Sequence, residues 1–141
     1  GSVSIECAIH LTKGEVYAIE RKEEAASLIE QNAHKASADH VHVIRGIAPD
    51  VLQGLPKPTH VFVGGSGGRL EEILNQVREA NPHVRIVVNA ITLETQSELL
   101  QYVRKHEIID ADIITMQVSR SETVAGYHMM RGENPIMIGS F

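Results

Sequence analysis

The densest group of residues that could bind a ligand is the run of small residues Gly64–Gly68, which follows the short apolar run His60–Val63. Glycine carries no side chain, so a ligand can approach its backbone closely. Successive backbone amides in such a turn, leading into a helix at Arg69, can bind a carboxylate. We therefore interpret this segment as part of a ligand crevice rather than as a flexible turn.

A second candidate site connects Gly1 with Glu20, the acid that ends the apolar run Val16–Glu20. In nucleotide-binding α/β folds, an acid about 20 residues after the cofactor loop accepts hydrogen bonds from the ribose hydroxyls. Glu20 lies 19 positions after Gly1. A single acid at a strand end is more often a solvated loop residue, but this spacing favours ribose binding. Gly1 and Ser2 are then the tail of a cofactor loop, although a Gly-Ser pair left from cloning is the alternative.

The elements that must position these residues alternate along the chain. Strands are expected at residues 16–20, 41–45, 60–63 and 84–88. Helical spacing of apolar residues predicts four helices: at residues 3–11, at residues 22–36, from Leu70 onward, and after the capping residue Thr92. The expected apolar face of the second helix consists of Ala25, Leu28, Ile29, Ala33 and Ala36. That of the third consists of Leu70, Ile73, Leu74 and Val77. The alternation predicts a doubly wound, mostly parallel α/β sheet of the Rossmann-like kind.

Both ends of the chain depart from this alternation. Asp112–Val118 and Ile136–Ile138 are expected to be strands with no convincing helix between them, so they should pair antiparallel. A parallel sheet that ends in an antiparallel hairpin is typical of the class I methyltransferase fold and unlike a nicotinamide-binding sheet.

At the other end of the chain a helix comes first, whereas a doubly wound fold opens with a central strand. We therefore predict one domain over residues 1–141, with its first strand absent from the chain.

Composition narrows the classes of partner. The formal net charge of −5 and the lack of a lysine and arginine cluster argue against nucleic acid. No apolar run is long enough to span a membrane, so a cytoplasmic protein is the default expectation.

The single cysteine, Cys7, excludes an intrachain disulfide and lies in an apolar stretch, where we expect it to be buried. His40 and His42 have no third ligand nearby in the sequence, so we expect no metal site.

Three sequence blocks carry a resemblance to a known family. VFVGGSGGRLEEIL at residues 61–74, RIVVNAITLET at residues 85–95 and VSRSETVAGYHMMRGENPIMI at residues 118–138 resemble the precorrin-6B C15-methyltransferase family. GSVSIE at the start and GIAPDVL at residues 46–52 match it more loosely. These are decarboxylating enzymes of cobalamin biosynthesis, found alone or as the C-terminal half of a precorrin-6Y enzyme. The resemblance covers essentially the whole chain.

The resemblance implies a reaction and its partners. A methyl group passes from S-adenosylmethionine to C15 of a corrin precursor, and carbon dioxide is lost from the C12 acetate. The substrate is a flat, largely apolar tetrapyrrole that carries many carboxylates, with or without cobalt. The resemblance also implies a homo-oligomer, a tetramer, and a preceding segment that holds the first strand and a D-x-G-x-G-type loop.

The expected site residues follow from these two lines of argument. The cofactor residues are Gly1, Ser2, Glu20, Ile47, Ala48 and Gly64. Methyltransferases often place an acid where this chain has Ile47, so adenine would be held by backbone amides and an apolar wall. The substrate residues are Gly65, Ser66, Gly67, Arg69, Thr92, Arg120 and Tyr127, with Arg131 as a further partner for carboxylates.

The catalytic candidates are few because the ring's own conjugated carbons act as the nucleophile and the electron sink. Proximity and orientation should then dominate, and no protein nucleophile or metal is expected. His128 is the candidate for proton handling or carboxylate contact, and Asn89 should face the reacting centre. Two alternatives are open: Tyr127 and His128 could pack inside the long hairpin loop, and Asn89 could be a turn residue.

Three other functions remain open from the sequence. One is another small-molecule or transfer-RNA methyltransferase of the same fold. A nicotinamide-dependent oxidoreductase is the second, and it predicts a parallel last strand. The third is a non-catalytic fragment, because a missing central strand leaves neighbouring strand edges unpaired.

Overall fold

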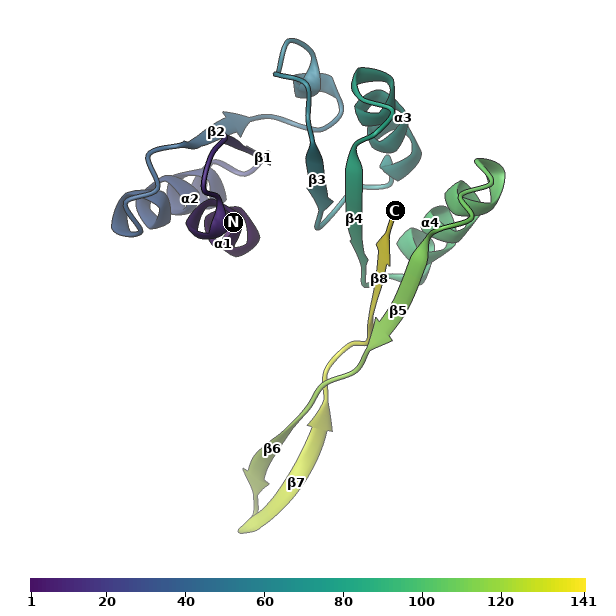
Figure 1. The fold of residues 1–141 in the computed structure, drawn as a ribbon. Coiled ribbons are helices and arrows are strands. Elements are labelled where there is room, and N and C mark those ends of the chain that lie inside the picture. The colour runs from purple at the N-terminus through teal and green to yellow at the C-terminus, as the bar shows by residue number, and fades with distance from the viewer. The chain divides into compact units, whose positions relative to one another are not determined.

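The computed structural model describes residues 1–141, which form two compact units, Gly1–Leu55 and Pro56–Phe141. Figure 1 labels the helices and strands of both units along the chain. None of the helices is both long enough and apolar enough to cross a membrane.

The first unit is a pair of parallel strands with two helices packed on it. Its elements are α1 (Ser2–His10), β1 (Val16–Glu20), α2 (Glu23–Lys35), β2 (Val41–Arg45) and a short 3-10 helix (Asp50–Leu52). β1 and β2 pair in parallel, from Val16 opposite Val41 to Glu20 opposite Arg45. The buried side chains between strands and helices are Ile5, Ala18, Ile29 and Ala33.

The helices and strands predicted for this unit are confirmed, but the buried face of α2 differs from the predicted one. Ala26, Ile29 and Ala33 are buried, whereas Leu28 is 55% exposed. Residues 26, 29 and 33 form one stripe along the helix, and Leu28 lies about 100° around the helix from Ile29. The prediction that Leu28 belongs to the core was therefore wrong.

Cys7 is also exposed, so the prediction that it is buried was wrong. α1 buries Ile5 and Ala8. Residues two positions apart do not share a helix face, and Cys7 lies two positions after Ile5.

The second unit is a four-stranded mixed sheet with two helices and a projecting ribbon. Its elements are β3 (His60–Val63), α3 (Leu70–Ala80), β4 (Arg85–Ala90), α4 (Leu93–Lys105), β5 (Asp112–Met116), β6 (Ser119–Val124), β7 (Tyr127–Gly132) and β8 (Ile136–Ser140). The strand order in the sheet is β3-β4-β8-β5. β3 and β4 are parallel, and β8 runs antiparallel to both of its neighbours. The predicted antiparallel pairing of β5 with β8 is thus confirmed.

The core of the second unit is built by α3 and α4 against β4 and β8. The predicted buried stripe of α3 is confirmed, with Leu70, Ile73, Leu74 and Val77 buried. Leu99 of α4 is fully buried against Gly139 of β8, where an added Cβ would lie 2.9 Å from Leu99 Cδ2. Glycine at this position lets the helix approach the sheet closely.

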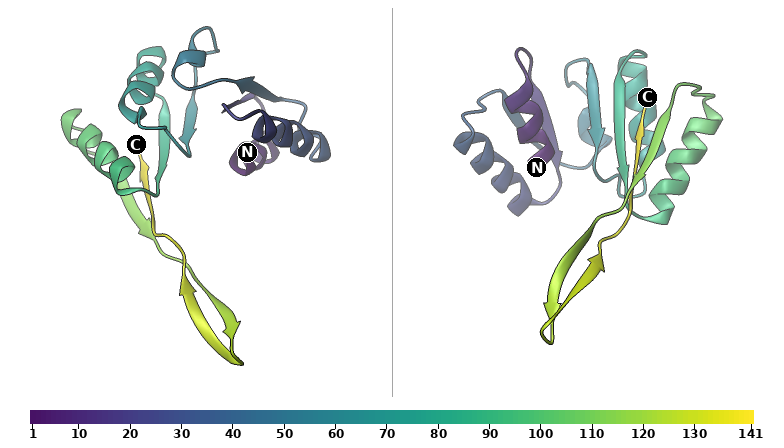
Figure 2. Two further views of the ribbon diagram at one scale, coloured as in Figure 1. Left: turned by 180° about the vertical axis from the view of Figure 1, so that it is seen from behind. Right: turned by 60° about the horizontal axis from the view of Figure 1, so that its bottom comes forward.

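The carboxyl ends of β3, β4 and β5 lie at one edge of this sheet, because β8 runs antiparallel to β4 and to β5. The glycine-rich run follows β3, and Ile91 follows β4 at that edge. β8 begins there as well, with Ile136 opposite Met116. Figures 1 and 2 show the β6–β7 ribbon leaving the sheet from the same edge.

The β6–β7 ribbon occupies the segment for which the sequence indicates no helix. Its strands pair antiparallel, from Ser119 opposite Gly132 to Val124 opposite Tyr127. The two turn residues, Ala125 and Gly126, both have positive φ, at 50° and 83°, as in a type I′ hairpin turn. Every residue of both strands is exposed.

The predicted alternation of strands and helices is confirmed, and the strands pair in three sheets. β1 and β2 form the first, β3, β4, β8 and β5 the second, and β6 and β7 the third. β1 pairs only with β2, and β3 pairs only with β4.

Candidate functional site

Glu20 is the acid at the carboxyl end of β1. Its Oε1 accepts a hydrogen bond from the backbone N–H of Lys22 at 2.9 Å, at the turn into α2. The side chain is half-buried, and its second carboxylate oxygen accepts no hydrogen bond in the structure. An acceptor is therefore available where the ribose-binding prediction requires one.

Arg45 lies opposite Glu20 in the β1–β2 pairing but forms its ion pairs with α2. Its guanidinium bonds both carboxylate oxygens of Glu30, at 2.8 and 3.0 Å, and its Nε bonds Glu23 at 3.0 Å. The hydrogen bond from Arg45 lowers the pKa of Glu30, and the bonds to Glu30 and Glu23 raise the pKa of Arg45. Arg45 therefore does not neutralise Glu20.

The start of α1 lies toward the same end of the first unit as Glu20. His40 precedes β2, and its Nε2 is 3.0 Å from the carbonyl oxygen of Ala8 in the last turn of α1. α1 therefore ends near the beginning of β2 and starts toward the carboxyl ends of the strands. A Cβ at Gly1 would lie 2.3 Å from Ile29 Cγ1, so glycine lets α1 start close against α2. The predicted cofactor residues at this end are Gly1, Ser2 and Glu20.

The segment after β2 completes this end of the first unit. Gly46 has φ 155°, and a Cβ there would lie 2.2 Å from Val51 Cγ1, so the turn requires glycine. The Ile47 side chain is 49% exposed, and Ala48 is half-buried before the cis peptide bond to Pro49. An exposed isoleucine suits the expected apolar wall for adenine. The assignment of Ile47 and Ala48 to the cofactor stays a prediction.

The glycine-rich run of the second unit has open space around it. A Cβ added at Gly65, Gly67 or Gly68 would meet no atom within 4 Å. Gly67 and Gly68 have φ of 60° and 81°, a conformation that favours glycine. Ser66 is only 7% exposed, and its hydroxyl has no hydrogen-bond partner. A buried hydroxyl without a partner is unusual and suits a loop that holds a ligand.

The anion site predicted where this run enters α3 is partly occupied by the protein itself. The backbone N–H of Leu70 donates to Glu98 Oε2 of α4 at 3.3 Å. The Arg69 guanidinium bonds the Glu72 carboxylate, with Nη2 2.8 Å from Oε2. The first amide of α3 is thus engaged by Glu98, and the assignment of Arg69 to a substrate carboxylate stays a prediction. Within the loop, the carbonyl oxygen of Ser66 accepts from Arg69 N–H at 3.2 Å, whereas the Ser66 hydroxyl has no partner.

Asn89 and Thr92 lie at the end of β4, at the same carboxyl edge. Asn89 is a strand residue opposite Ile138 of β8, so the alternative that it is a turn residue was wrong. Its half-buried side chain makes no hydrogen bond in the structure. Thr92 caps α4 as predicted, because its hydroxyl accepts from Thr95 N–H at 3.2 Å. Asn89 therefore has a free amide at this edge, whereas the Thr92 hydroxyl is already engaged.

Tyr127 and His128 lie near the tip of the ribbon. Tyr127 is 74% exposed and His128 is exposed, so the alternative that they pack inside a loop was wrong. Neighbouring residues of a strand point to opposite faces, so the two side chains do not form one group. His128 is three residues beyond Arg131 along β7, about 10 Å at the usual rise per residue. The structure therefore does not bring His128 together with Asn89.

The arginines of the ribbon are both paired with carboxylates, but unequally. Arg120 Nε lies 2.6 Å from Glu133 Oε1. Arg131 Nη1 lies 3.4 Å from Glu122 Oε2, a long and exposed contact. Of the two, Arg131 is thus the one more easily engaged by a ligand.

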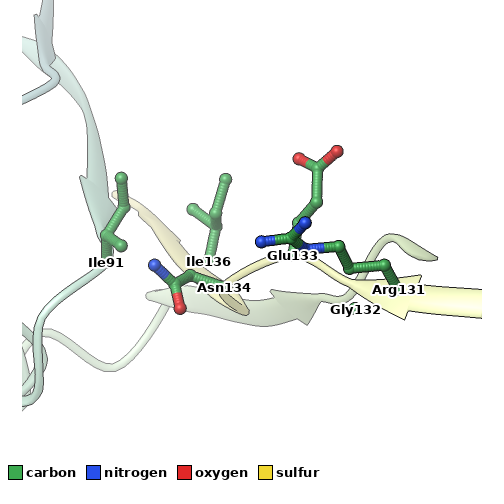
Figure 3. A pocket seen from close by; sticks show the side chains of 6 residues that line it. All are labelled: Ile91, Arg131, Gly132, Glu133, Asn134 and Ile136. Atoms are coloured by element: carbon green, nitrogen blue, oxygen red, sulfur yellow. The ribbon is translucent and has the colours of Figure 1, made fainter. Parts of the chain in front are cut away.

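A pocket of about 510 Å³ opens where the ribbon joins the sheet. Figure 3 shows the side chains that line it, Ile91, Arg131, Gly132, Glu133, Asn134 and Ile136. Of these the sequence analysis singled out only Arg131. Ile91 lies in the block at residues 85–95, and the others lie in the block at residues 118–138, whose pocket-forming role depends on how β7 returns to β8.

The predicted site residues thus fall into three groups. The cofactor residues of the first unit gather at the carboxyl ends of β1 and β2. Those at the carboxyl edge of the second unit are Gly64, Gly65, Ser66, Gly67, Arg69, Asn89 and Thr92. The residues on the ribbon are Arg120, Tyr127, His128 and Arg131. In the described chain no cluster of histidine, cysteine and acidic residues could hold a metal.

Comparisons with known proteins agree with this architecture. A family profile described as the precorrin methyltransferase domain matches residues 1–140. The probable cobalt-precorrin-6B C(15)-methyltransferase (decarboxylating) of Pyrobaculum calidifontis is 36% identical over 140 residues, which are 98% of this chain and 71% of that protein. The protein of the same name from Methanothermobacter thermautotrophicus is 35% identical with the same coverage.

Solved structures show the same relationship. A precorrin-6Y C5,15-methyltransferase from Geobacter metallireducens matches with a TM-score of 0.86 and 33% identity, over 99% of this chain and 73% of that one. A precorrin-8W decarboxylase from Methanobacterium thermoautotrophicum matches with a TM-score of 0.85 and 34% identity, over 99% and 75%.

A more distant likeness concerns the fold alone. An S-adenosylmethionine-dependent O-methyltransferase from Thermotoga maritima has a TM-score of 0.62 at 17% identity, over 90% of this chain and 49% of that one. The Rossmann-like methyltransferase fold and the family predicted from the sequence blocks are both confirmed. This chain is a methyltransferase domain and belongs to the precorrin methyltransferase domain family.

Proposed function

We propose that this protein methylates C15 of cobalt-precorrin-6B or precorrin-6B in cobalamin biosynthesis, with decarboxylation and with S-adenosylmethionine as the donor. The observation that carries the proposal is the similarity to curated relatives that bear this activity in their names, over 98% of the chain. The antiparallel β8 supports a methyltransferase over a nicotinamide-dependent oxidoreductase, for which a parallel last strand is expected.

The residues of the first unit are suited to hold S-adenosylmethionine, which supplies an electrophilic methyl group. In the proposal Glu20 accepts hydrogen bonds from the ribose hydroxyls through the carboxylate oxygen that Lys22 leaves unengaged. The exposed Ile47 side chain covers one face of adenine. Gly1 and Ser2 contribute the positive end of α1.

The carboxyl edge of the second unit is suited to a flat tetrapyrrole. The open space around Gly65 and Gly67 lets a ring approach the backbone closely. The free amide of Asn89 orients the ring at the end of β4. The ring's conjugated electrons form the new bond from C15 to the methyl group, and the pair of the broken S–CH₃ bond stays on sulfur, which leaves S-adenosylhomocysteine. The pair from the broken C–CO₂ bond returns to the ring. The protein's part is to position the ring.

We further propose that the protein is a homo-oligomer, a tetramer, and that the ribbon is its contact surface. All residues of β6 and β7 are exposed, including the apolar side chains Val124, Met129 and Met130. A two-stranded ribbon has no core of its own and gains stability when its apolar side chains are covered. Light scattering after size-exclusion chromatography tests this, because Met129→Glu and Met130→Glu together should yield the monomer.

The enzymatic proposal is tested by titration with S-adenosylhomocysteine and by turnover of cobalt-precorrin-6B. We expect binding of S-adenosylhomocysteine, no binding of NAD, and a product whose mass shows one added methyl group and one lost carbon dioxide. Methylation without loss of carbon dioxide would contradict the decarboxylating reaction. If S-adenosylhomocysteine does not bind, the proposal is wrong.

A further inference from the structure

We propose that the pocket at the base of the ribbon is a specificity subsite, in which Asn134 and Arg131 hold one carboxylate arm of the substrate between Ile91 and Ile136. The inference rests on the proposed tetrapyrrole substrate and adds a site for one of its side chains. Within the second unit this pocket joins the end of β4 to the connection between β7 and β8.

The pocket lies next to Asn89, at the carboxyl edge of the second unit's sheet, where we expect the reacting atoms of the substrate. Ile91 lies two residues after Asn89, just beyond the end of β4. Ile136 begins β8, and Ile138, on the same face two residues later, is the neighbour of Asn89. An arm that enters the pocket therefore extends from a ring held near Asn89.

The polar groups of the pocket leave two donors for a ligand. Glu133 is bonded by Arg120 at 2.6 Å, so its charge is compensated within the protein. Arg131 has only the 3.4 Å contact to Glu122. The Asn134 side chain has no hydrogen bond in the structure. Figure 3 shows the Asn134 amide on the side of Ile91 and the Arg131 side chain extending along β7 toward Glu133.

The remaining surface of the pocket is apolar. Ile91 is 49% exposed, and Ile136 is half-buried beside it. Two isoleucines next to an arginine and an amide match a ligand that has a short hydrocarbon stem and a terminal carboxylate. Acetate and propionate arms of a tetrapyrrole have this form. A volume of about 510 Å³ in an open pocket suits one arm with part of its ring.

The base of the ribbon is held in place by the protein itself. The backbone N–H of Glu133 donates to the carbonyl oxygen of Val118 at 2.8 Å. This bond closes the base of the ribbon between Arg131, near the end of β7, and Asn134, in the connection to β8. The bond restrains the backbone on both sides of Glu133, which lowers the entropic cost of ordering Arg131 and Asn134 on a ligand.

The test is titration of cobalt-precorrin-6B into protein saturated with S-adenosylhomocysteine, a complex that cannot turn over. Arg131→Gln should raise the Kd about tenfold and Asn134→Ala about threefold, as expected for loss of hydrogen bonds to a charged group. The matched controls are Arg104→Gln and Asn75→Ala on the exposed surfaces of α4 and α3, which should leave the Kd unchanged. The Kd for S-adenosylhomocysteine should not change in any variant.

The outcomes separate this inference from the proposed function. Normal affinity for cobalt-precorrin-6B in Arg131→Gln and Asn134→Ala, with turnover in the wild type, would overturn the subsite and leave the function standing. Wild-type protein that binds S-adenosylhomocysteine but neither binds nor converts cobalt-precorrin-6B would overturn both. An equal effect of the control variants would show general electrostatics and would also refute the subsite.

Discussion

The Glu98 carboxylate of α4 accepts a hydrogen bond at 3.3 Å from the backbone N–H of Leu70, the first residue of α3. An acid at a helix N-terminus is stabilising because it meets unpaired N–H groups and the positive end of the helix dipole. Here the acid comes from the neighbouring helix, so the bond also fixes the packing of α3 on α4. The entrance of α3 is thereby closed to a ligand carboxylate at Leu70.

Replacing Glu98 tests this connection. Glu98→Ala should lower the free energy of unfolding by about 1 kcal/mol, the usual cost of losing a helix N-cap. Urea unfolding followed by circular dichroism measures it. The control is Glu79→Ala, an exposed acid in the last turn of α3, which should cost less. Equal losses in both variants would show that the bond to Leu70 adds nothing.

Gly139 should not tolerate a larger side chain. Its Cβ would lie 2.9 Å from Leu99 Cδ2, and Leu99 is fully buried. Gly139→Val should therefore destabilise the fold by about 1–3 kcal/mol. Leu99→Ala alone should cost about 2–5 kcal/mol. The double variant should lose less than the sum of the two, because the smaller side chain makes room for the larger one. Additive losses in thermal unfolding would contradict the contact.

The glycine-rich run should show two different responses to alanine. Gly65 has open space around it and no positive φ, so Gly65→Ala should change the free energy of unfolding by less than about 0.5 kcal/mol. Gly67 has φ 60°, and Gly67→Ala should cost about 1 kcal/mol or more. If the run binds the tetrapyrrole, Gly65→Ala should still raise the KM for cobalt-precorrin-6B. An unchanged KM would argue for a turn without a binding role.

Glu20 is expected to act on cofactor binding. Glu20→Ala should raise the Kd for S-adenosylhomocysteine about tenfold or more, because two ribose hydroxyls lose a charged acceptor. Calorimetric titration measures the effect. Glu24→Ala, an exposed acid in the first turn of α2, is the control and should leave the Kd unchanged. If Glu20→Ala also binds normally, the ribose assignment is wrong.

The Glu30–Arg45 ion pair predicts how stability depends on pH. Bonding to Arg45 lowers the pKa of Glu30 below its ordinary value of 4.5. The contribution to stability is therefore present above about pH 4.5 and is lost as the pH falls through the lower folded-state pKa. Wild type should exceed Glu30→Gln in stability at neutral pH, and the difference should shrink under acid and in high salt. Thermal unfolding at several pH values checks this, and a difference that persists in acid would contradict it.

The local elements could be predicted from the sequence because neighbouring residues determine them. The stripe Leu70, Ile73, Leu74 and Val77 specifies the buried face of α3 through helical periodicity alone. Thr92 forms a cap with Thr95, three residues away. The antiparallel pairing of β5 with β8 followed from the missing crossover helix. The glycine-rich run likewise lies at a strand's carboxyl end, as its place after residues 60–63 indicated.

The availability of the predicted binding groups was decided by contacts between distant residues. Glu98, 28 positions after Leu70, occupies the first amide of α3, next to the loop that was expected to bind a carboxylate. Glu133 engages Arg120 across 13 positions. The ribbon separates His128 from Asn89, and the return of its second strand forms the pocket around Asn134. The sequence by itself determined the local elements and the family, because these depend on short spacings and on the residue types in the blocks. Only the tertiary structure decided which polar groups are free, because each is engaged or left open by a partner from another element.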